Sequence, residues 1–376
     1  MSTIEIKDIR VHYGAHEAVK DLSFSCEEGK LTCILGPSGA GKTSTLKAVA
    51  GIVSIVSGRV VIDGHDMAGL PPQKRNLAMT FEGYNLYPHF TVYENFAFPL
   101  RSPLRKGDYD ENAMDKRIRN IAKLLEIDFL LDRFPREISG GQKQRVALGR
   151  MLVRENPAAY LLDEPIAHLD AKLRHQMVGE LKRIHMELKA TMLYATPDAE
   201  EAIALADIII FIDGGQIVQV GTAEEMILEP ATMFVAEFIG EPKINFFQCS
   251  VKEENVFEGE TQRIHIDPES FKKLQEKYAF SKGQRINIGI RPQYCSFATK
   301  RPKTNHVDPE MNVNVIEPRG DSVIITLWAG KEICHIKQKE LKGELKMYSK
   351  VYMTVEPSNI HIFDENGKNL IRKRSG

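Results

Sequence analysis

The chain has 376 residues, of which 43% are hydrophobic and 27% charged, a composition typical of a soluble protein with two or three domains. Its 50 Lys and Arg residues balance 51 Asp and Glu residues, so net charge does not indicate nucleic acid as a partner. Five cysteines are widely spaced without a C-x-x-C pair, which favours reduced thiols in the cytoplasm over a disulfide or zinc framework. We expect no signal peptide at the N-terminus, and the apolar run 202–212 is too short to span a bilayer.

The chain begins with two predicted antiparallel strands. Residues 4–13 largely alternate apolar and polar side chains, which predicts the first strand. Within residues 19–26, Leu22–Phe24 are predicted to form the second strand. Tyr13 stands at the end of the first strand. Its ring is placed to stack on an adenine base, and the alternative is that Tyr13 is an ordinary half-buried strand residue. Its position in the sequence leaves both interpretations open.

A phosphate-binding loop follows the apolar strand Leu31–Leu35 and precedes a predicted helix starting at Ser44. The loop fits G-x-x-x-x-G-K-[ST], and it comprises Gly36, Pro37, Ser38, Gly39, Ala40, Gly41, Lys42 and Thr43. Backbone N–H groups at a helix N-terminus attract anions, and Lys42 adds a full positive charge for the β- and γ-phosphates. The Thr43 hydroxyl is suited to Mg²⁺. This stretch predicts a nucleotide site.

An aromatic loop follows the next predicted strands. Residues 57–64 indicate a strand and turn, and residues 76–81 indicate a further strand. The loop from Tyr84 to His89 is apolar and contains proline, so it is either a docking surface or a loop folded over its own core.

The next stretch of the chain changes to a helical pattern. Residues 108–132 carry apolar side chains at helical spacing, which predicts a helical insertion between about 90 and 155. The insertion ends at a glycine-rich helix start that offers a second anion site, made of Ser139, Gly140, Gly141 and Gln142.

Two carboxylates end the apolar strand that follows. Asp163 is suited to hold Mg²⁺, and Glu164 is suited to polarise a water molecule. Beyond them, helices at 171–188 and 199–206 alternate with strands at 191–196 and 208–212, which predicts an α/β sheet.

The pattern changes again from about Pro242. Short alternating strands separated by tight turns predict a small, separate all-β barrel of the OB type. We therefore expect a nucleotide-binding domain over residues 1–240 and a regulatory barrel over residues 241–376.

Together these motifs resemble the ATP-binding-cassette (ABC) ATPases. The resemblance depends on the phosphate loop, the signature 138–142, and the segment 161–165 followed by Leu169 and Asp170. The chain also resembles the ATPase subunits of carbohydrate importers of the maltose and glycerol-phosphate type. This second resemblance lies in the stretches 221–240, 289–292, 317–318 and 362–364.

The resemblance implies roles for the residues. Two nucleotide-binding domains would face each other, with ATP between the phosphate loop of one and the signature of the other. Tyr13 would stack on adenine, Thr43 and Asp163 would hold Mg²⁺, and Glu164 with Lys42 would serve hydrolysis. The loop 84–89 would receive the permease, beside an extracytoplasmic solute-binding protein, at the cytoplasmic face of the inner membrane.

Two positions differ from the family pattern. Glu82 stands where the family has glutamine, and Pro197 stands where it has a histidine that contacts the γ-phosphate. A carboxylate cannot donate as an amide does, and proline offers no donor at all. One lost donor typically costs about 10²–10³-fold in rate. We therefore expect this chain's own site, with Glu82 among its catalytic positions, to hydrolyse ATP slowly beside a more complete paralogue.

Two alternatives remain. One is a regulatory subunit that binds nucleotide without hydrolysing it. The other is a non-transport ABC switch whose barrel binds nucleic acid, which the charge balance, the single cassette and the apolar loop disfavour.

Overall fold

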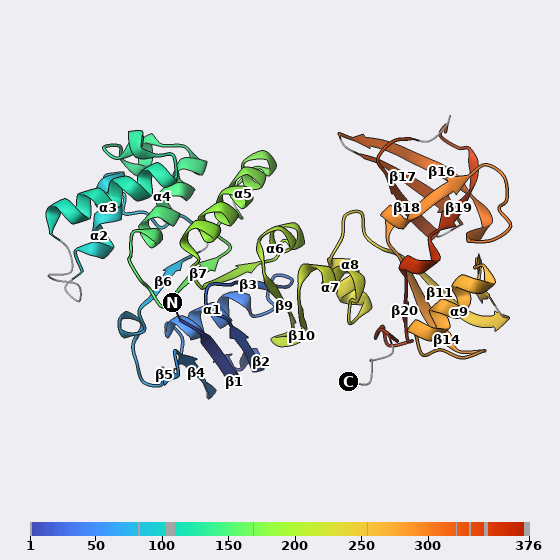
Figure 1. Cartoon of the computed structure of the whole chain (residues 1–376), viewed down its shortest axis with the longest axis horizontal. Helices are drawn as coiled ribbons and strands as arrows, with labels where there is room; N and C mark the ends of the chain where they lie inside the picture. The colour runs from blue at the N-terminus through green and yellow to red at the C-terminus, as the bar shows by residue number, and fades with distance from the viewer. Residues whose placement is uncertain are drawn as a thin grey trace. The chain divides into compact units, whose positions relative to one another are not determined.

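The computed structural model describes residues 2–81, 83–102, 110–167, 169–253, 255–320, 322–330, 332–341 and 345–371 (Figure 1). Contacts within the chain divide it into two compact units, Met1–Ala223 and Glu224–Gly376. This division groups residues 224–240 with the second unit, whereas the sequence suggested a boundary at 240, which stays a prediction.

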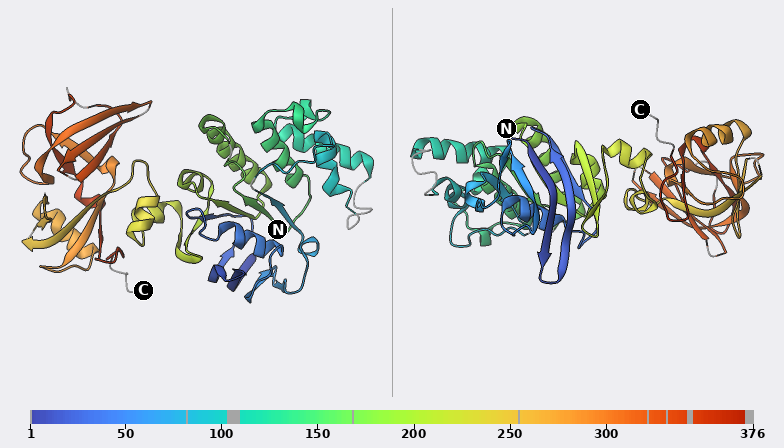
Figure 2. Two further views of the ribbon diagram at one scale, coloured as in Figure 1. Left: turned by 180° about the vertical axis from the view of Figure 1, so that it is seen from behind. Right: turned by 90° about the horizontal axis from the view of Figure 1, so that it is seen from below.

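The first unit contains a four-stranded antiparallel sheet in the order β2-β1-β4-β5. Its strands are β1 (Ile4–Tyr13), β2 (His16–Cys26), β4 (Ser57–Ile62) and β5 (His65–Asp66). Figure 2 shows β1 and β2 as long neighbouring strands in dark blue. The strand predicted over 4–13 is confirmed, and the second strand is longer than Leu22–Phe24.

A six-stranded sheet forms the centre of the first unit, in the order β10-β9-β3-β8-β7-β6. Its strands are β3 (Leu31–Leu35), β6 (Leu77–Thr80), β7 (Ala159–Asp163), β8 (Met192–Thr196), β9 (Ile208–Asp213) and β10 (Gln216–Gly221). All pairs are parallel except β9 with β10. Every residue of β3, β7 and β8 is buried, as expected for central strands covered on both faces.

Helix α1 (Lys42–Ala50) contributes Leu46, Ala48 and Val49 to one hydrophobic core that both sheets share. This packing fixes the position of the loop before the helix relative to the central sheet. Helices α5 (Ala171–Leu188) and α6 (Ala199–Leu205) complete the α/β arrangement. Among the described residues, no helix is both long and apolar enough to cross a membrane.

The predicted helical segment comprises α2 (Val92–Leu100), α3 (Glu111–Leu124) and α4 (Gly140–Leu152). It also contains 3₁₀ turns at Asp128–Leu130 and Pro135–Glu137. A separate 3₁₀ turn, Pro72–Lys74, precedes β6. The three helices gather on one side of the first unit (Figure 1). Helices α2 and α4 approach closely at Gly149, where a Cβ atom would lie 2.0 Å from the Phe96 ring. Only glycine therefore permits this crossing.

The second unit begins with two short helices and continues as an antiparallel barrel-like sheet. The helices are α7 (Ala223–Leu228) and α8 (Met233–Phe238). The strands are β11 (Asn245–Glu253), β12 (Val256–Glu258), β13 (Arg263–His265), β14 (Arg285–Ile290), β15 (Cys295–Ala298), β16 (His306–Arg319), β17 (Ser322–Ala329), β18 (Glu332–Gln338), β19 (Lys350–Val355) and β20 (Ile360–Phe363). Two 3₁₀ turns, Pro292–Tyr294 and Pro357–Asn359, connect strands.

One helix in this unit was missed by the sequence analysis. Helix α9 (Pro268–Lys277) is capped by Asp267, whose side chain accepts from the Ser270 N–H, and proline occupies its first position. Phe271 and Leu274 face the barrel core. An Asp-Pro pair is a signal for a helix start, but the alternating pattern on both sides of it predicted strands.

Arg291 ties the two short helices to the barrel. It is 2% exposed and follows β14, and its guanidinium donates to the carbonyl oxygens of Ile227, Ala236 and Ile239. These carbonyls end α7 and α8, where unpaired acceptors and the helix dipole favour a cation. Burial lowers the pKa of Arg291 to about 10, so the side chain remains charged at neutral pH.

We predict that Arg291→Met destabilises the second unit by about 3 kcal/mol, because it leaves carbonyls buried without a donor. The measurement is urea unfolding followed by fluorescence of Trp328, the single tryptophan of the chain, which lies in β17. Arg319→Ala is the control, because its ion pairs with Glu241 and Glu317 are exposed and screened by solvent, so its loss should leave the unfolding midpoint nearly unchanged. Equal effects of both substitutions would contradict this role of Arg291.

Candidate functional site

The strand order of the central sheet brings four segments to one edge. Because β3, β8, β7 and β6 are adjacent and parallel, their carboxyl ends meet at the same side of the sheet. Leu35 pairs with Thr196, Asp163 pairs with Ala195, and Thr80 pairs with Leu162. The phosphate loop, Pro197, the two carboxylates and the end of β6 therefore line one edge.

The phosphate loop turns sharply from β3 into α1. Gly41 caps the helix with a φ of 101°, and Gly39 has a φ of 81°, both in the left-handed region that favours glycine. A Cβ on Gly36 would lie 2.1 Å from the Ile212 carbonyl oxygen, and one on Gly41 would lie 2.5 Å from that of Ala18. The glycines of the motif are therefore required by close backbone contacts as well as by the turn.

Lys42 lies within the loop that it helps to form. Its side chain is 4% exposed, and its Nζ donates to the carbonyl oxygens of Gly36 and Pro37 at 3.0 and 3.1 Å. The same Nζ lies 3.5 Å from the Glu164 carboxylate. The loop thus holds the ammonium group at the helix N-terminus, where its charge adds to that of the backbone N–H groups.

Oxygen ligands for a divalent cation lie side by side at this edge. The Thr43 hydroxyl donates to Asp163 Oδ1 at 2.8 Å, and Asp163 is 2% exposed. A hydroxyl and a carboxylate are ligands that suit Mg²⁺, which is held by few protein oxygens together with phosphates. These donors fit the cation that the sequence predicts.

Glu164 follows directly after β7 in a strained backbone conformation. Its φ is 44°, in the left-handed region that non-glycine residues rarely adopt. Its N–H donates to the Ala195 carbonyl of β8, which holds the turn. Strain of this kind persists where the surrounding structure enforces it, often at functional sites. Here it places the carboxylate beside Lys42.

Pro197 lies next to the start of the phosphate loop, because Thr196 pairs with Leu35 in the parallel ladder. The end of β8 is supported by Glu201, a buried residue that accepts hydrogen bonds from the hydroxyls of Tyr194 and Thr196 at 2.8 and 2.7 Å. Burial raises the pKa of Glu201, against the opposing effect of these hydrogen bonds. The sequence analysis missed Glu201, since an acid in the first turn of a helix is ordinary.

His185 cannot replace the missing histidine at this edge. Its Nε2 contacts the Gly29 carbonyl at 3.1 Å. Gly29 precedes β3, whereas the phosphate loop follows that strand about 16 Å further on. Burial lowers the pKa of His185. Glu82, the other position that differs from the family pattern, lies outside the described residues.

The predicted signature begins α4. Ser139 caps the helix in a reciprocal arrangement with Gln142, in which each side chain accepts from the other residue's backbone N–H. A Cβ on Gly141 would lie 2.4 Å from Leu173 of α5. The sequence Ser-Gly-Gly-Gln thus shapes an exposed helix N-terminus that closely approaches a neighbouring helix.

Tyr13 is 46% exposed at the end of β1. A phenol ring with this exposure is available for stacking, as the adenine interpretation requires. No described contact decides between that interpretation and an ordinary strand tyrosine, so the role of Tyr13 stays a prediction.

The aromatic loop borders a groove of about 740 Å³, but only Tyr87 of residues 84–89 lines it. Its other walls come from β6, α2 and α4, and they include Phe98, Met79, Met151 and Arg150. The Tyr87 and Phe98 ring centroids lie 4.5 Å apart. Both rings are partly exposed, at 37% and 47%, so the groove presents apolar surface to solvent.

Arg150 organises this groove, and the sequence analysis missed it. Its guanidinium carbon lies 5.1 Å from the Tyr87 ring centroid, and one of its nitrogens donates to the Asn85 carbonyl at 2.6 Å. Asn95 adds a second support, accepting from the Tyr87 N–H at 2.9 Å. The partners of Arg150 are about 65 positions away in sequence, so no local signal could indicate them.

Comparisons with known proteins agree with this arrangement. The family model described as ABC transporter matches residues 19–167, and the one described as MalK OB fold domain matches residues 240–295. The ATP-binding cassette MJ0796, solved as a dimer in a post-hydrolysis state bound to ADP and Pi, is 27% identical. That match covers 58% of this chain and 98% of the cassette, with a TM-score of 0.53.

Similar proteins extend over both units. The trehalose/maltose import ATP-binding protein MalK of Thermococcus litoralis is 37% identical over 375 residues, covering 97% of this chain and 98% of that protein. The sn-glycerol-3-phosphate import ATP-binding protein UgpC of Vibrio cholerae is 35% identical, covering 98% and 95%. The chain therefore belongs to the ABC transporter ATP-binding proteins of the carbohydrate-importer family, in which the ATPase domain is followed by a MalK-type OB domain.

Proposed function

We propose that this chain binds Mg²⁺ and ATP at the edge formed by β3, β7 and β8, and that it powers import of a sugar, sugar alcohol or glycerol-phosphate-like solute. The family membership supports the solute class, and the paired Thr43 and Asp163 oxygens support the cation. The permease and a solute-binding protein would select the solute, so the ATPase would act peripherally at the cytoplasmic face of the inner membrane.

Different residues at this edge would bind the phosphates, bind the cation and activate the water. The phosphate loop and Lys42 would hold the β- and γ-phosphates, and Thr43 and Asp163 would hold Mg²⁺, which neutralises charge on these phosphates. Glu164 would polarise the attacking water, because its carboxylate lies 3.5 Å from the Lys42 Nζ that would contact the γ-phosphate. The Ser139–Gln142 helix start would serve the opposite site of a dimer.

This chain's own site would be slow. The observation that carries this proposal is the register of β3 and β8, which puts Pro197 beside Gly36. A side-chain donor is absent there, and in the sequence Glu82 replaces the glutamine of the family with a carboxylate that cannot donate. The intact signature would still complete the site of a partner. We therefore propose a heterodimer with a more complete paralogue.

The groove beside Tyr87 is the proposed permease site. It combines partly exposed aromatic rings with a half-buried arginine that contacts the loop, the composition of an interface core. A short amphipathic helix of a membrane subunit could occupy such a groove. Because α4 runs from the signature to this groove, one rigid helix would connect permease contact with the opposite ATP site.

Restoring the family residues tests the slow site. Purified alone, the chain should hydrolyse ATP weakly, and the double variant Glu82→Gln/Pro197→His should raise kcat by about 100-fold, because one missing donor costs about 10²–10³-fold. Adding Glu164→Gln to the double variant should remove the gain. Vigorous turnover by the unaltered homodimer would contradict the proposal.

A second test separates slow hydrolysis from none. In the transporter purified with its own partner subunits, Glu164→Gln should lower ATP turnover measurably, since this site would retain a residual contribution. Glu187→Gln, at an exposed position on α5, serves as the control with no expected change. Unchanged turnover in the Glu164 variant would instead favour a regulatory subunit that binds nucleotide only.

The permease site has its own test. Tyr87→Ala or Phe98→Ala should weaken co-purification with the membrane subunits about 30-fold, the effect of losing an interface anchor, while leaving ATP binding unchanged. Phe129→Ala is the matched control, because that ring is 70% exposed and lies outside the groove. If Phe129→Ala weakened association as strongly as Tyr87→Ala, the groove would not be the docking site.

A further inference from the structure

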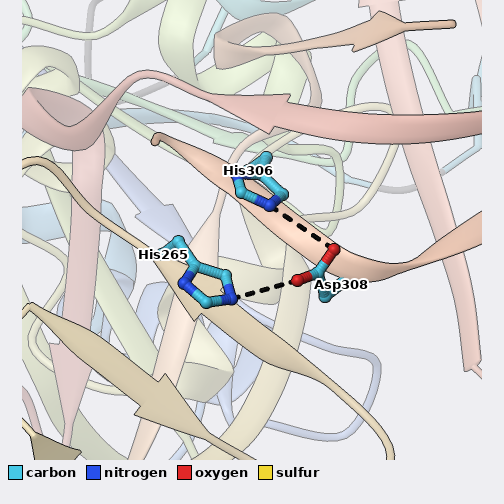
Figure 3. A group of neighbouring side chains, drawn as sticks. All are labelled: His265, His306 and Asp308. Carbon is cyan, nitrogen blue, oxygen red and sulfur yellow. Dashed lines mark ion pairs between the residues drawn. The ribbon is translucent and has the colours of Figure 1, made fainter. Parts of the chain in front are cut away.

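Three metal-ligating side chains gather where β13 and β16 pair in the second unit (Figure 3). His265 and His306 are directly opposite in the antiparallel ladder, and Asp308 is two residues beyond His306 on the same face of β16. His265 Nε2 lies 3.1 Å from Asp308 Oδ2, and His306 Nε2 lies 3.4 Å from Asp308 Oδ1. The carboxylate therefore faces both rings.

His306 is buried with few polar neighbours. It is 2% exposed, its Nε2 lies 3.4 Å from Asp308 Oδ1, and the Thr304 backbone is a further polar partner of its ring. His265 Nε2 is likewise buried, 3.1 Å from Asp308 Oδ2. Two imidazole nitrogens therefore lie on either side of one carboxylate, away from solvent, which is an arrangement in which His and Asp side chains can share a metal ion.

We propose that His265, His306 and Asp308 bind a divalent transition-metal ion of the zinc class. Two imidazoles and a carboxylate are a donor set that zinc prefers, whereas calcium and magnesium prefer oxygen alone. The three ligand atoms lie within 4.8 Å of one another. In a tetrahedral zinc site such atoms lie about 3.4 Å apart, close to the two distances between the rings and the carboxylate.

One ring must turn to complete the site. The two imidazole planes are nearly parallel, at 10°, with centroids 4.8 Å apart, so their in-plane lone pairs do not yet converge. The His265 side chain is 25% exposed and can rotate about its Cβ–Cγ bond. His306 is held in place by the edge of the Tyr352 ring, at a centroid distance of 6.0 Å. We therefore expect His306 and Asp308 to form the fixed part of the site.

An open hollow of about 560 Å³ includes Asp308 and Tyr352 in its lining. It offers an entry path for the ion and room for a water molecule at the fourth coordination position. Glu258 and Glu310 also line this hollow. Glu258 forms an ion pair with Arg263, and Glu310 forms one with Lys350.

Arg301 is the competitor for the site. Its guanidinium contacts Asp308 Oδ2, the oxygen that also faces His265. The Arg301 side chain is 60% exposed, so it can move into solvent when an ion arrives. Its positive charge nevertheless opposes a second cation on the same carboxylate. Removing this charge should therefore strengthen metal binding, the opposite of what loss of a ligand would do.

The test uses the full chain, treated with a chelator and titrated with Zn²⁺ in competition with a chromophoric chelator. We expect one ion per chain, weakened more than about 100-fold by His306→Ala or Asp308→Asn, since even neighbours of ligands contribute about 10–100-fold. Arg301→Gln should strengthen binding about 10-fold, because it removes a positive charge that repels the ion. With Co²⁺ alone, absorption bands without thiolate charge transfer should show that the buried cysteines are not ligands.

Controls keep the result interpretable. His65→Ala removes an exposed histidine of β5 and should leave zinc affinity unchanged. If His306→Ala disturbs the barrel, seen as altered Trp328 fluorescence, His265→Ala and Asp308→Asn decide the outcome. Equal zinc affinity in those two variants and the unaltered chain would overturn the proposal, and so would failure of the unaltered chain to take up zinc.

Discussion

The parallel pairing of β3 with β8, and of β8 with β7, is the constraint on which the nucleotide site depends. Each parallel ladder sets its strands in one direction, so the residues after Leu35, Thr196 and Asp163 meet at one edge. These strands are buried on both faces, and a shift in register would expose apolar side chains. The energy of the core thereby fixes the positions of Lys42, Asp163 and Glu164, the residues proposed to act on the nucleotide.

Close packing also restricts the backbone at the functional edges. Gly36 and Gly41 approach carbonyl groups too closely for any side chain, and Gly141 meets Leu173 in the same way. These contacts connect the loops to β9, β2 and α5. The glycines of the two motifs therefore have a packing role besides the phosphate-binding role proposed for them, and replacing them would disturb the sheet together with the site.

In the second unit, a buried charge joins the two short helices to a barrel that has its own hydrophobic core. Arg291 places one buried charge against the carbonyl ends of two short helices, and it joins residues 224–240 to the barrel. The histidine and aspartate cluster lies on β13 and β16. Among the buried polar groups of this unit, Arg291 donates to three carbonyl oxygens, whereas His306 has the Asp308 carboxylate and the Thr304 backbone as polar neighbours.

The sequence by itself determined the fold class, the phosphate loop and the paired carboxylates, because these depend on local spacing: a strand, a glycine-rich turn and a helix start. It also indicated the change from α/β to all-β character, because a period of two differs from a helical period. Only the tertiary structure decided that Pro197 lies beside Gly36, that Arg150 supports Tyr87, and that Arg291 caps two helices. The reason is physical: these contacts join residues far apart in the chain, and their energy depends on strand register and burial, which no local pattern encodes.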